Sequence, residues 1–332
     1  MNIQQAIKTV KPAAKKGGLI ALQTEGDELR LTAVNPAFSI TAIADTDTDI
    51  TCAIDADMFA NAVQKFGDGS TIDHADNKLT IKQGRSRVSI DSRPVDDVPL
   101  MDDAIGGSVM ISGDRLEAIG RVIFAAGVDD VRPYLNGVLV SISGSDTDVV
   151  ATNGHVMAYQ SFQGDDEGKS VNAIIGRDAV SALLSISDKC YIGGKVRGES
   201  DDATITINPI DAEFPDWNRV VPKFENKLTF MREDMIIAID RVMVTMKEKF
   251  IGALMNISNG EIVIESTKGD AQAAIDCHGG AGMQIGINAR YVRDAVAGMP
   301  DGSTVVLEYT DANTATRFTD GELYVVVMPM RV

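Results

Sequence analysis

Two short segments near the middle of the chain mix charged, aromatic and apolar side chains in an unusual way. They are residues 132–137 (RPYLNG) and 151–157 (ATNGHVM). Arginine, threonine and histidine beside leucine and methionine are typical of a surface that docks a protein segment, because apolar side chains anchor it and polar groups orient it. The alternative is that both segments are only strand ends closed by turn residues. These two segments alone leave that alternative open.

The stretch between the two segments predicts how they are positioned. Residues 138–142 form an alternating apolar run, and a polar Gly-Ser-Asp cluster, residues 144–146, follows it. Alternation followed by turn residues is typical of a β-hairpin. The hairpin would bring both segments to the same edge of a sheet.

Length and composition exclude several classes of protein. A chain of 332 residues is long enough for two or three domains, and its 44% hydrophobic content is ordinary for a globular protein. No apolar run approaches the ~18 residues of a membrane span, and the first residues lack the pattern of a signal peptide. Three distant cysteines, Cys52, Cys190 and Cys277, indicate neither a disulfide framework nor a zinc site. We therefore expect a cytoplasmic protein that does not bind a membrane.

The chain contains an internal repeat with a period close to one third of its length. An Ala-Ile pair followed three residues later by Val occurs at 6–10, 118–122 and 238–242, with offsets of 112 and 120 residues. A second unit, a helical pattern opening at 54, 175 and 287, lies between these copies. Repeats of this kind predict one structural plan used three times.

The repeat predicts an α+β protein of three similar domains, each with two short helices packed on β-sheet. Alternating strand patterns follow the helices, as at 79–82, 203–207, 261–265 and 304–308. Proline- and glycine-containing connections near 96–107 and 221–226 give expected boundaries at 1–105, 106–226 and 227–332. The first copy lacks the strand that precedes the helix in the other two, so we expect a shortened first domain.

Positive charge is concentrated in the predicted helices although the chain as a whole carries a net charge of -17. Taken as 2–16, 55–66, 113–124, 176–187, 231–247 and 287–298, they hold 13 of the 31 Lys and Arg but only 9 of the 48 Asp and Glu. For any single helix this is simply a solvated face. Six helices on one concave side would instead give a basic lining suited to sequence-independent phosphate contacts. Such a lining overrides the argument that net negative charge excludes nucleic acid.

Four further segments complete a recognisable order of motifs. They are residues 84–90 (GRSRVSI), 214–222 (FPDWNRVVP), 285–292 (IGINARYV) and 324–332 (YVVVMPMRV). Together with 132–137, 151–157 and the threefold repeat, they closely resemble the bacterial sliding clamp, the β subunit of DNA polymerase III. Departures include Pro133, Asn153, Val156 and Asp178, which replace a usual Tyr, Asp, Arg and Lys.

The resemblance implies a head-to-tail homodimer that forms a six-domain ring around duplex DNA, as a non-catalytic processivity factor. It also implies a clamp loader, and polymerases and repair proteins that dock through short linear peptides. One alternative is a monomeric clamp-like module that competes for clamp partners. A second is a hydrolase, for which the sequence assembles no nucleophile and base.

The resemblance also assigns sites. A peptide pocket between the second and third domains would contain Leu135, Thr152, Gly154, His155, Met157, Pro215 and Val220, the tail residues Val326, Met328, Pro329, Met330 and Arg331, and the rim residues Arg132, Tyr134, Arg219, Asn288 and Tyr291. DNA would contact Lys8, Lys11, Lys15, Arg121, Tyr134, Arg177, Arg241, Arg290 and Arg293. The dimer interface would place Val88 and Ile90 of one subunit against 244–250 of the other, including Val244 and Phe250.

No cofactor, metal site or catalytic residue is expected. His74, His155 and His278 show no metal-ligand spacing. Cys277 has no positioned third partner for a nucleophilic role. Residues 45–49 begin like a calcium loop, but Ile50 stands where glycine is needed.

Overall fold

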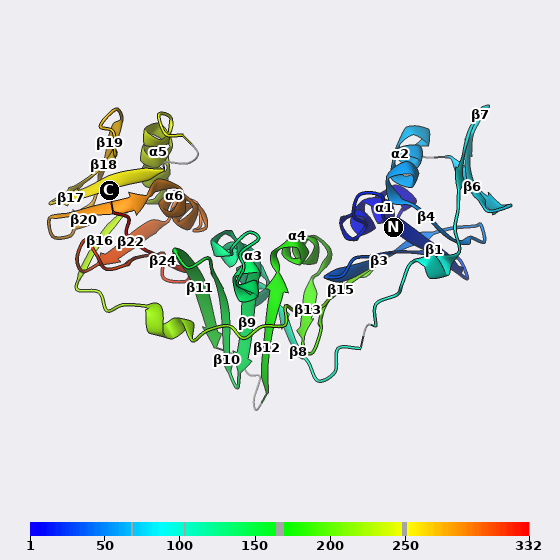
Figure 1. Cartoon of the computed structure of the whole chain (residues 1–332), viewed down its shortest axis with the longest axis horizontal. Coiled ribbons are helices and arrows are strands. Elements are labelled where there is room, and N and C mark those ends of the chain that lie inside the picture. Colours follow the sequence, from blue (N-terminus) through cyan, green and yellow to red (C-terminus); the bar gives the residue numbers. More distant parts are fainter. Residues whose placement is uncertain (68, 103, 164–168, 248–250, 332) are drawn as a thin grey trace. The chain divides into compact units, whose positions relative to one another are not determined.

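The computed structural model describes residues 1–67, 69–102, 104–163, 169–247 and 251–331. Six α-helices lie within this described part, among antiparallel strands (Figure 1). The chain forms two compact units. The first contains Met1–Glu117 and Val171–Ile210, and the second contains Ala118–Ser170 and Asp211–Val332.

The first unit is built on one eight-stranded sheet, in the order β4-β1-β2-β3-β15-β14-β13-β8, and a three-stranded sheet, β5-β6-β7. The strands of these two sheets are β1 (Leu19–Glu25), β2 (Glu28–Val34), β3 (Phe38–Asp45), β4 (Thr51–Asp55), β5 (Thr71–Ala75), β6 (Lys78–Gln83), β7 (Ser86–Asp91), β8 (Val109–Ser112), β13 (Lys189–Ile192), β14 (Val196–Glu199) and β15 (Ala203–Ile207). Strand β12 (Ser170–Gly176) belongs to neither of these sheets. The helices of the first unit are α1 (Ile3–Val10), α2 (Ala56–Phe66) and α4 (Arg177–Ile186), with 3₁₀ turns η1 (Lys11–Ala13) and η2 (Val95–Asp97).

The second unit contains a sheet in which β9-β10-β11-β24-β23-β22-β16-β20 are successive neighbours, and a four-stranded sheet, β19-β18-β17-β21. Its strands are β9 (Gly137–Ser143), β10 (Asp146–Thr152), β11 (Val156–Gln163), β16 (Asn226–Met231), β17 (Gly252–Ser258), β18 (Glu261–Ser266), β19 (Gln272–Asp276), β20 (His278–Gly279), β21 (Met283–Asn288), β22 (Thr304–Tyr309), β23 (Thr316–Thr319) and β24 (Tyr324–Val327). Helices α5 (Arg232–Met243) and α6 (Ala289–Ala297) pack together, and η3 (Ile123–Ala125), η4 (Pro133–Asn136) and η5 (Trp217–Val220) are 3₁₀ turns (Figure 1). Helix α3 (Asp114–Val122) spans the boundary between the units.

Side chains at the helix ends explain where three of these helices begin. Asn2 caps α1 by accepting a hydrogen bond from the Gln5 amide, and Asp55 caps α2 in the same way through Met58. Asn288 caps α6. A side-chain oxygen at this position satisfies a backbone N–H that has no partner inside the helix.

The repeated Ala-Ile-Val pattern forms the buried face of three helices, as the sequence predicts. Ile7, Ile119 and Ile239 occupy its central position in α1, α3 and α5, and each is at most 3% exposed. The expected strands at 79–82, 203–207, 261–265 and 304–308 are also confirmed, as β6, β15, β18 and β22. The predicted hairpin is β9–β10, in which Val149 pairs with Val140.

The sequence predicted one helix over the basic residues 2–16, and this prediction was wrong. Helix α1 ends at Val10, and the chain continues as the short 3₁₀ turn η1. Pro12 causes this change, because proline has no N–H to donate to the preceding turn of an α-helix. Lys15 therefore lies beyond the helical part rather than on the same helix face as Lys8.

Each large sheet continues across an expected domain boundary. Strand β3 pairs with β15, with Ile40 opposite Ile205, and β11 pairs with β24, with Met157 opposite Val326. The two compact units therefore follow the two large sheets, not the expected domains. The division into 1–105, 106–226 and 227–332 stays a prediction. None of the described helices combines the length and the apolar character needed to cross a membrane.

Replacing Ile239 by Ala should lower the free energy of unfolding by about 2–5 kcal/mol, because its side chain is fully buried and would leave a cavity. Ile237 on the same helix is 47% exposed, so Ile237→Ala should cost no more than about 0.5 kcal/mol. Denaturant unfolding followed by circular dichroism measures both. Equal losses would contradict the assignment of this helix face to the core.

Candidate peptide-docking surface and DNA-facing helices

The turn between β10 and β11 is held by its own side chains. Asn153 Oδ1 accepts hydrogen bonds from the backbone N–H groups of His155 (2.9 Å) and Val156 (3.0 Å). Thr152 Oγ1 donates to the Val156 carbonyl at 2.8 Å and accepts from the Gly154 N–H at 3.0 Å. Gly154 has φ +87°, which only glycine adopts readily. The turn is thus a fixed platform rather than a loose loop.

The C-terminal tail is attached to this turn by its backbone. The Met328 N–H donates to the His155 carbonyl at 2.9 Å, and the Met330 N–H donates to the Gly286 carbonyl at 2.8 Å. These bonds leave the methionine side chains at the surface, 47% and 37% exposed. Two adaptable apolar side chains on a fixed backbone suit the docking of apolar anchors.

The same backbone arrangement occurs in the first unit, but with different chemistry. There the Asn208 N–H donates to the Ala37 carbonyl at 2.8 Å, and the Ile210 N–H donates to the Ile174 carbonyl at 2.8 Å. Asn208 takes the position that Met328 takes in the second unit, and its side-chain amide donates to the Pro36 carbonyl at 3.2 Å. The first unit thus has a polar, internally bonded residue where the second unit presents methionine.

The turn η4 brings the other predicted segment to the docking surface. Leu135 is 2% exposed and serves as core, whereas the half-buried ring of Tyr134 meets the edge of Phe214 at a centroid distance of 6.1 Å. Phe214 was missed by the sequence reasoning, which selected only its neighbour Pro215. Its place as the first residue of the 214–222 motif was the available signal.

Arg132 is held in place by an acidic neighbour. Its Nε and one terminal nitrogen each donate to the Asp130 carboxylate at 3.0 Å. These bonds from the guanidinium lower the pKa of Asp130 to about 2. A Cβ atom at Gly154 would lie 3.6 Å from both terminal nitrogens of Arg132. The guanidinium therefore lies beside the turn and is fixed in orientation.

The remaining predicted pocket residues differ in exposure. Met157 and Val326 are each 4% exposed and pair across β11 and β24, so they belong to the core beneath the candidate surface. Val220 is 62% exposed, and Pro215, Arg219, His155, Pro329 and Arg331 are also accessible. Arg219 forms an ion pair with Asp216 at 2.8 Å.

Two of the predicted rim residues, Asn288 and Tyr291, make hydrogen bonds within the protein that the sequence did not predict. Asn288 is 9% exposed, and its Oδ1 accepts from the N–H groups at the start of α6. Tyr291 accepts a hydrogen bond from Asn153 Nδ2 at 3.2 Å. Asn153, one of the departures from the family pattern, therefore links the turn to α6.

An aromatic cluster supports η5 from the sheet. Tyr159 packs on Trp217 at 4.8 Å and stacks on Tyr324 at 5.1 Å between ring centroids. Arg317 lies over the Tyr324 ring and donates through Nε to Glu308 at 2.6 Å. The sequence did not reveal this cluster, because its members are distant in the chain and ordinary in type.

The DNA-facing candidates lie on the helices or at their ends, but some are paired with carboxylates. The ion pairs are Lys11 with Asp57 (3.2 Å), Arg121 with Glu322 (3.4 Å) and Arg293 with Asp240 (2.6 Å). Within the described ranges, no ion pair involves Lys8, Lys15 or Arg241, which are all exposed. Arg290 is exposed on α6, and Arg177 opens α4 half-buried. The accessible positive charge is smaller than the residue count implies.

The predicted interface residues of the first unit line a cavity of about 790 Å³ between α2 and β7. Val88 and Ile90 contribute to it together with Met58, which is 61% exposed. In the second unit Val244 is 82% exposed. Phe250, the other predicted interface residue, lies outside the described residues.

The comparisons with known proteins identify the family. A model of the central domain of the DNA polymerase III β subunit matches residues 111–216. A β sliding clamp of Pseudomonas aeruginosa is 30% identical over 277 residues, 77% of this chain and 75% of the relative. The chain belongs to the β sliding clamp family. A clamp of Caulobacter vibrioides is 28% identical and extends the match to 94% of this chain and 91% of its own.

Solved clamps have the same fold. The clamp of Pseudomonas aeruginosa bound to griselimycin has a TM-score of 0.91 and 23% identity, covering 99% of this chain and 97% of its own. A Helicobacter pylori clamp bound to a DNA ligase peptide has a TM-score of 0.90 and 15% identity, covering 99% and 98%. These structures confirm the predicted α+β clamp fold. The sequence relationship to β sliding clamps confirms the predicted function of a non-catalytic DNA sliding clamp.

The environment of Cys277 opposes a role as a nucleophile. Cys277 is 4% exposed, and burial raises the pKa of its thiol. A raised pKa lowers the fraction of reactive thiolate at neutral pH. Among the described residues, no group of three or more His, Cys, Asp or Glu is arranged to hold a metal ion.

The Asp130 carboxyl should titrate near pH 2 in the folded clamp, below its usual value of about 3.9. A lowered pKa means that the pair with Arg132 is fully formed above the usual value and is lost as the pH falls through about 2. Carboxyl-carbon NMR measures this titration. In Arg132→Ala the Asp130 pKa should rise toward the ordinary range, and an unchanged value would show that Arg132 is not its cause.

Proposed function

We propose that this clamp is a head-to-tail homodimer whose six domains form a ring around duplex DNA. In this proposal it tethers replicative and repair polymerases and docks them through short linear peptides. The observation that carries the proposal is the 30% identity to a β sliding clamp over three quarters of both chains. We also propose a clamp loader, which opens the ring, and a cytoplasmic location, both supported by kinship with bacterial clamps.

The proposed domains are residues 1–105, 106–226 and 227–332. The central-domain match at 111–216 supports the middle one. The buried Ala-Ile-Val pattern in α1, α3 and α5 supports one plan used three times. Six such domains in a dimer would place twelve helices around the hole.

The proposed peptide site is the surface built by the β10–β11 turn, η4, η5, the start of α6 and the tail. Exposed Met328, Met330 and Val220 would receive apolar anchors of the peptide, while Arg132 and Arg219 orient it at the rim. Further support comes from the Helicobacter pylori clamp, whose structure contains a DNA ligase peptide. We propose that peptides of this kind bind here.

The proposed DNA contacts are made by the basic helices. Lys8, Lys15 and Arg241, exposed and outside any ion pair of the described residues, would make the main phosphate contacts. Arg121, Arg177, Arg290, Arg293, Lys11 and Tyr134 would contribute less directly. Charge of this kind holds DNA without reading its sequence.

The proposed dimer interface would join two strands at sheet edges. Strand β7 is an edge of the sheet β5-β6-β7, and β19 is an edge of β19-β18-β17-β21. Exposed edges carry unpaired backbone groups that readily pair with another chain. The apolar cavity with Val88, Ile90 and Met58 lies beside β7, and we propose that Val244 of the partner chain approaches it.

Replacing Met328 and Met330 together by Ala should weaken binding of a short peptide with Leu and Phe anchors by about 5- to 30-fold, because the apolar contacts are lost. Fluorescence anisotropy of the labelled peptide measures the affinity. Met231 is a matched control, since it is 44% exposed on β16 of the same unit. Met231→Ala should bind normally, and equal loss in both variants would remove the tail from the site.

Replacing Met58 by Lys should convert the dimer to a monomer, because a charge would replace an apolar side chain in the part of the cavity beside Val88 and Ile90. Sedimentation should give a wild-type mass near twice the 35.4 kDa chain mass and a variant mass near that of one chain. Met110 is 46% exposed on β8, so Met110→Lys serves as the control and should remain dimeric. A monomeric wild type at micromolar concentration would refute the ring.

A further inference from the structure

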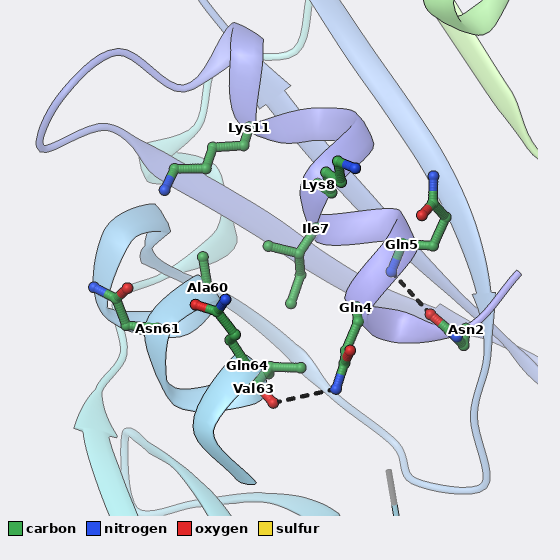
Figure 2. A pocket seen from close by; sticks show the side chains of 10 residues that line it. All are labelled: Asn2, Gln4, Gln5, Ile7, Lys8, Lys11, Ala60, Asn61, Val63 and Gln64. Carbon is green, nitrogen blue, oxygen red and sulfur yellow. Dashed lines mark hydrogen bonds between the residues drawn. The ribbon is translucent and has the colours of Figure 1, made fainter. Parts of the chain in front are cut away.

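A groove of about 350 Å³ separates α1 from α2 in the first unit (Figure 2). Its polar lining consists of the side-chain amides of Asn2, Gln4, Gln5, Asn61 and Gln64 and the ammonium groups of Lys8 and Lys11. Ile7 and Val63 form its apolar part between the helices. The groove is therefore rich in hydrogen-bond donors and carries positive charge.

Several of these donors have no partner within the protein. Gln4 Nε2 donates to the Val63 carbonyl at a long 3.5 Å, and Lys11 is paired with Asp57. In the part of the chain that the structure describes, no hydrogen bond or ion pair engages the side chains of Lys8, Asn61 or Gln64. Their polar ends are thus available to an external group.

The charges around the groove favour an anion. Residues 2–16 contain four lysines and no acidic residue. In the helix pair of the second unit, Arg293 of α6 is bound to Asp240 of α5 at 2.6 Å. Lys11 is likewise bound to Asp57 of α2 at 3.2 Å, but Lys8, Asn61 and Gln64 at the α1–α2 groove keep side chains without a partner among the described residues.

We propose that the α1–α2 groove seats a phosphodiester group of the DNA backbone. Lys8 supplies most of the attraction, since Lys11 is paired with Asp57, and the Asn61 and Gln64 amides donate hydrogen bonds to the phosphate oxygens. The inference rests on the proposed function and deepens it, since it adds neutral donors to a grip otherwise made by charges. Neutral donors release no counterions, so their share of the affinity is nearly independent of salt.

The test is binding of a fluorescent, linear duplex DNA, onto which a closed ring can thread, measured by anisotropy over a series of salt concentrations. The double variant Asn61→Leu/Gln64→Met replaces both amides with apolar groups of similar size. We expect about 3- to 10-fold weaker binding at every salt concentration, with an unchanged slope of log affinity against log salt. Lys8→Gln should instead reduce that slope by up to about 0.9.

Gln23→Met on β1 of the same unit is the matched control, because Gln23 lies outside the groove. It should bind DNA like the wild type, and all variants should keep the wild-type mass and melting temperature. Normal binding by the amide variant, with weakened binding by Lys8→Gln, would overturn the phosphate seat and leave the encircling function intact. Absence of duplex binding by the wild type would overturn both.

Discussion

The candidate docking surface of this clamp depends on one set of backbone hydrogen bonds, those that attach strand β24 to β11. Strand β24 pairs with β11, and Met328 continues the pairing by donating to the His155 carbonyl. Because these bonds fix the tail at the turn, two methionine side chains remain at the surface instead of collapsing into the core. The Asn153 and Thr152 bonds within the turn then hold the other half of the same surface. Loss of this pairing would separate the two halves, whatever their side chains.

The internal repeat shows how one backbone plan serves different tasks. Both units attach a strand to a turn through equivalent backbone bonds, made by Asn208 in the first and Met328 in the second. The side chains at this position differ: the Asn208 amide donates to the Pro36 carbonyl, whereas Met328 is 47% exposed. Equivalent backbone bonds thus carry a self-bonded polar side chain in one unit and an exposed apolar one in the other.

The neighbours of each basic side chain likewise decide how much of its charge is available. The acidic chain concentrates its lysines and arginines in helices, but Asp57, Glu322 and Asp240 engage three of them. An ion-paired cation attracts phosphate less strongly than a free one, because the carboxylate offsets its field. The basic helices therefore differ in unpaired charge, and Lys8 and Lys15 of the acid-free segment 2–16 are exposed outside any ion pair of the described residues.

The sequence by itself determined the family, the α+β plan, the repeated buried face of α1, α3 and α5, and the segments that meet at the docking surface. These follow from periodicity and from motifs in order, which are properties of the chain taken locally. Only the tertiary structure decided which of the candidate residues are accessible. Met157 and Leu135 became core, Asn288 became a helix cap, and Phe214 and the Tyr159–Trp217–Tyr324 cluster were added. Exposure and pairing depend on which distant residues meet, as when Arg317 reaches Tyr159, 158 residues away, and no local pattern encodes that encounter.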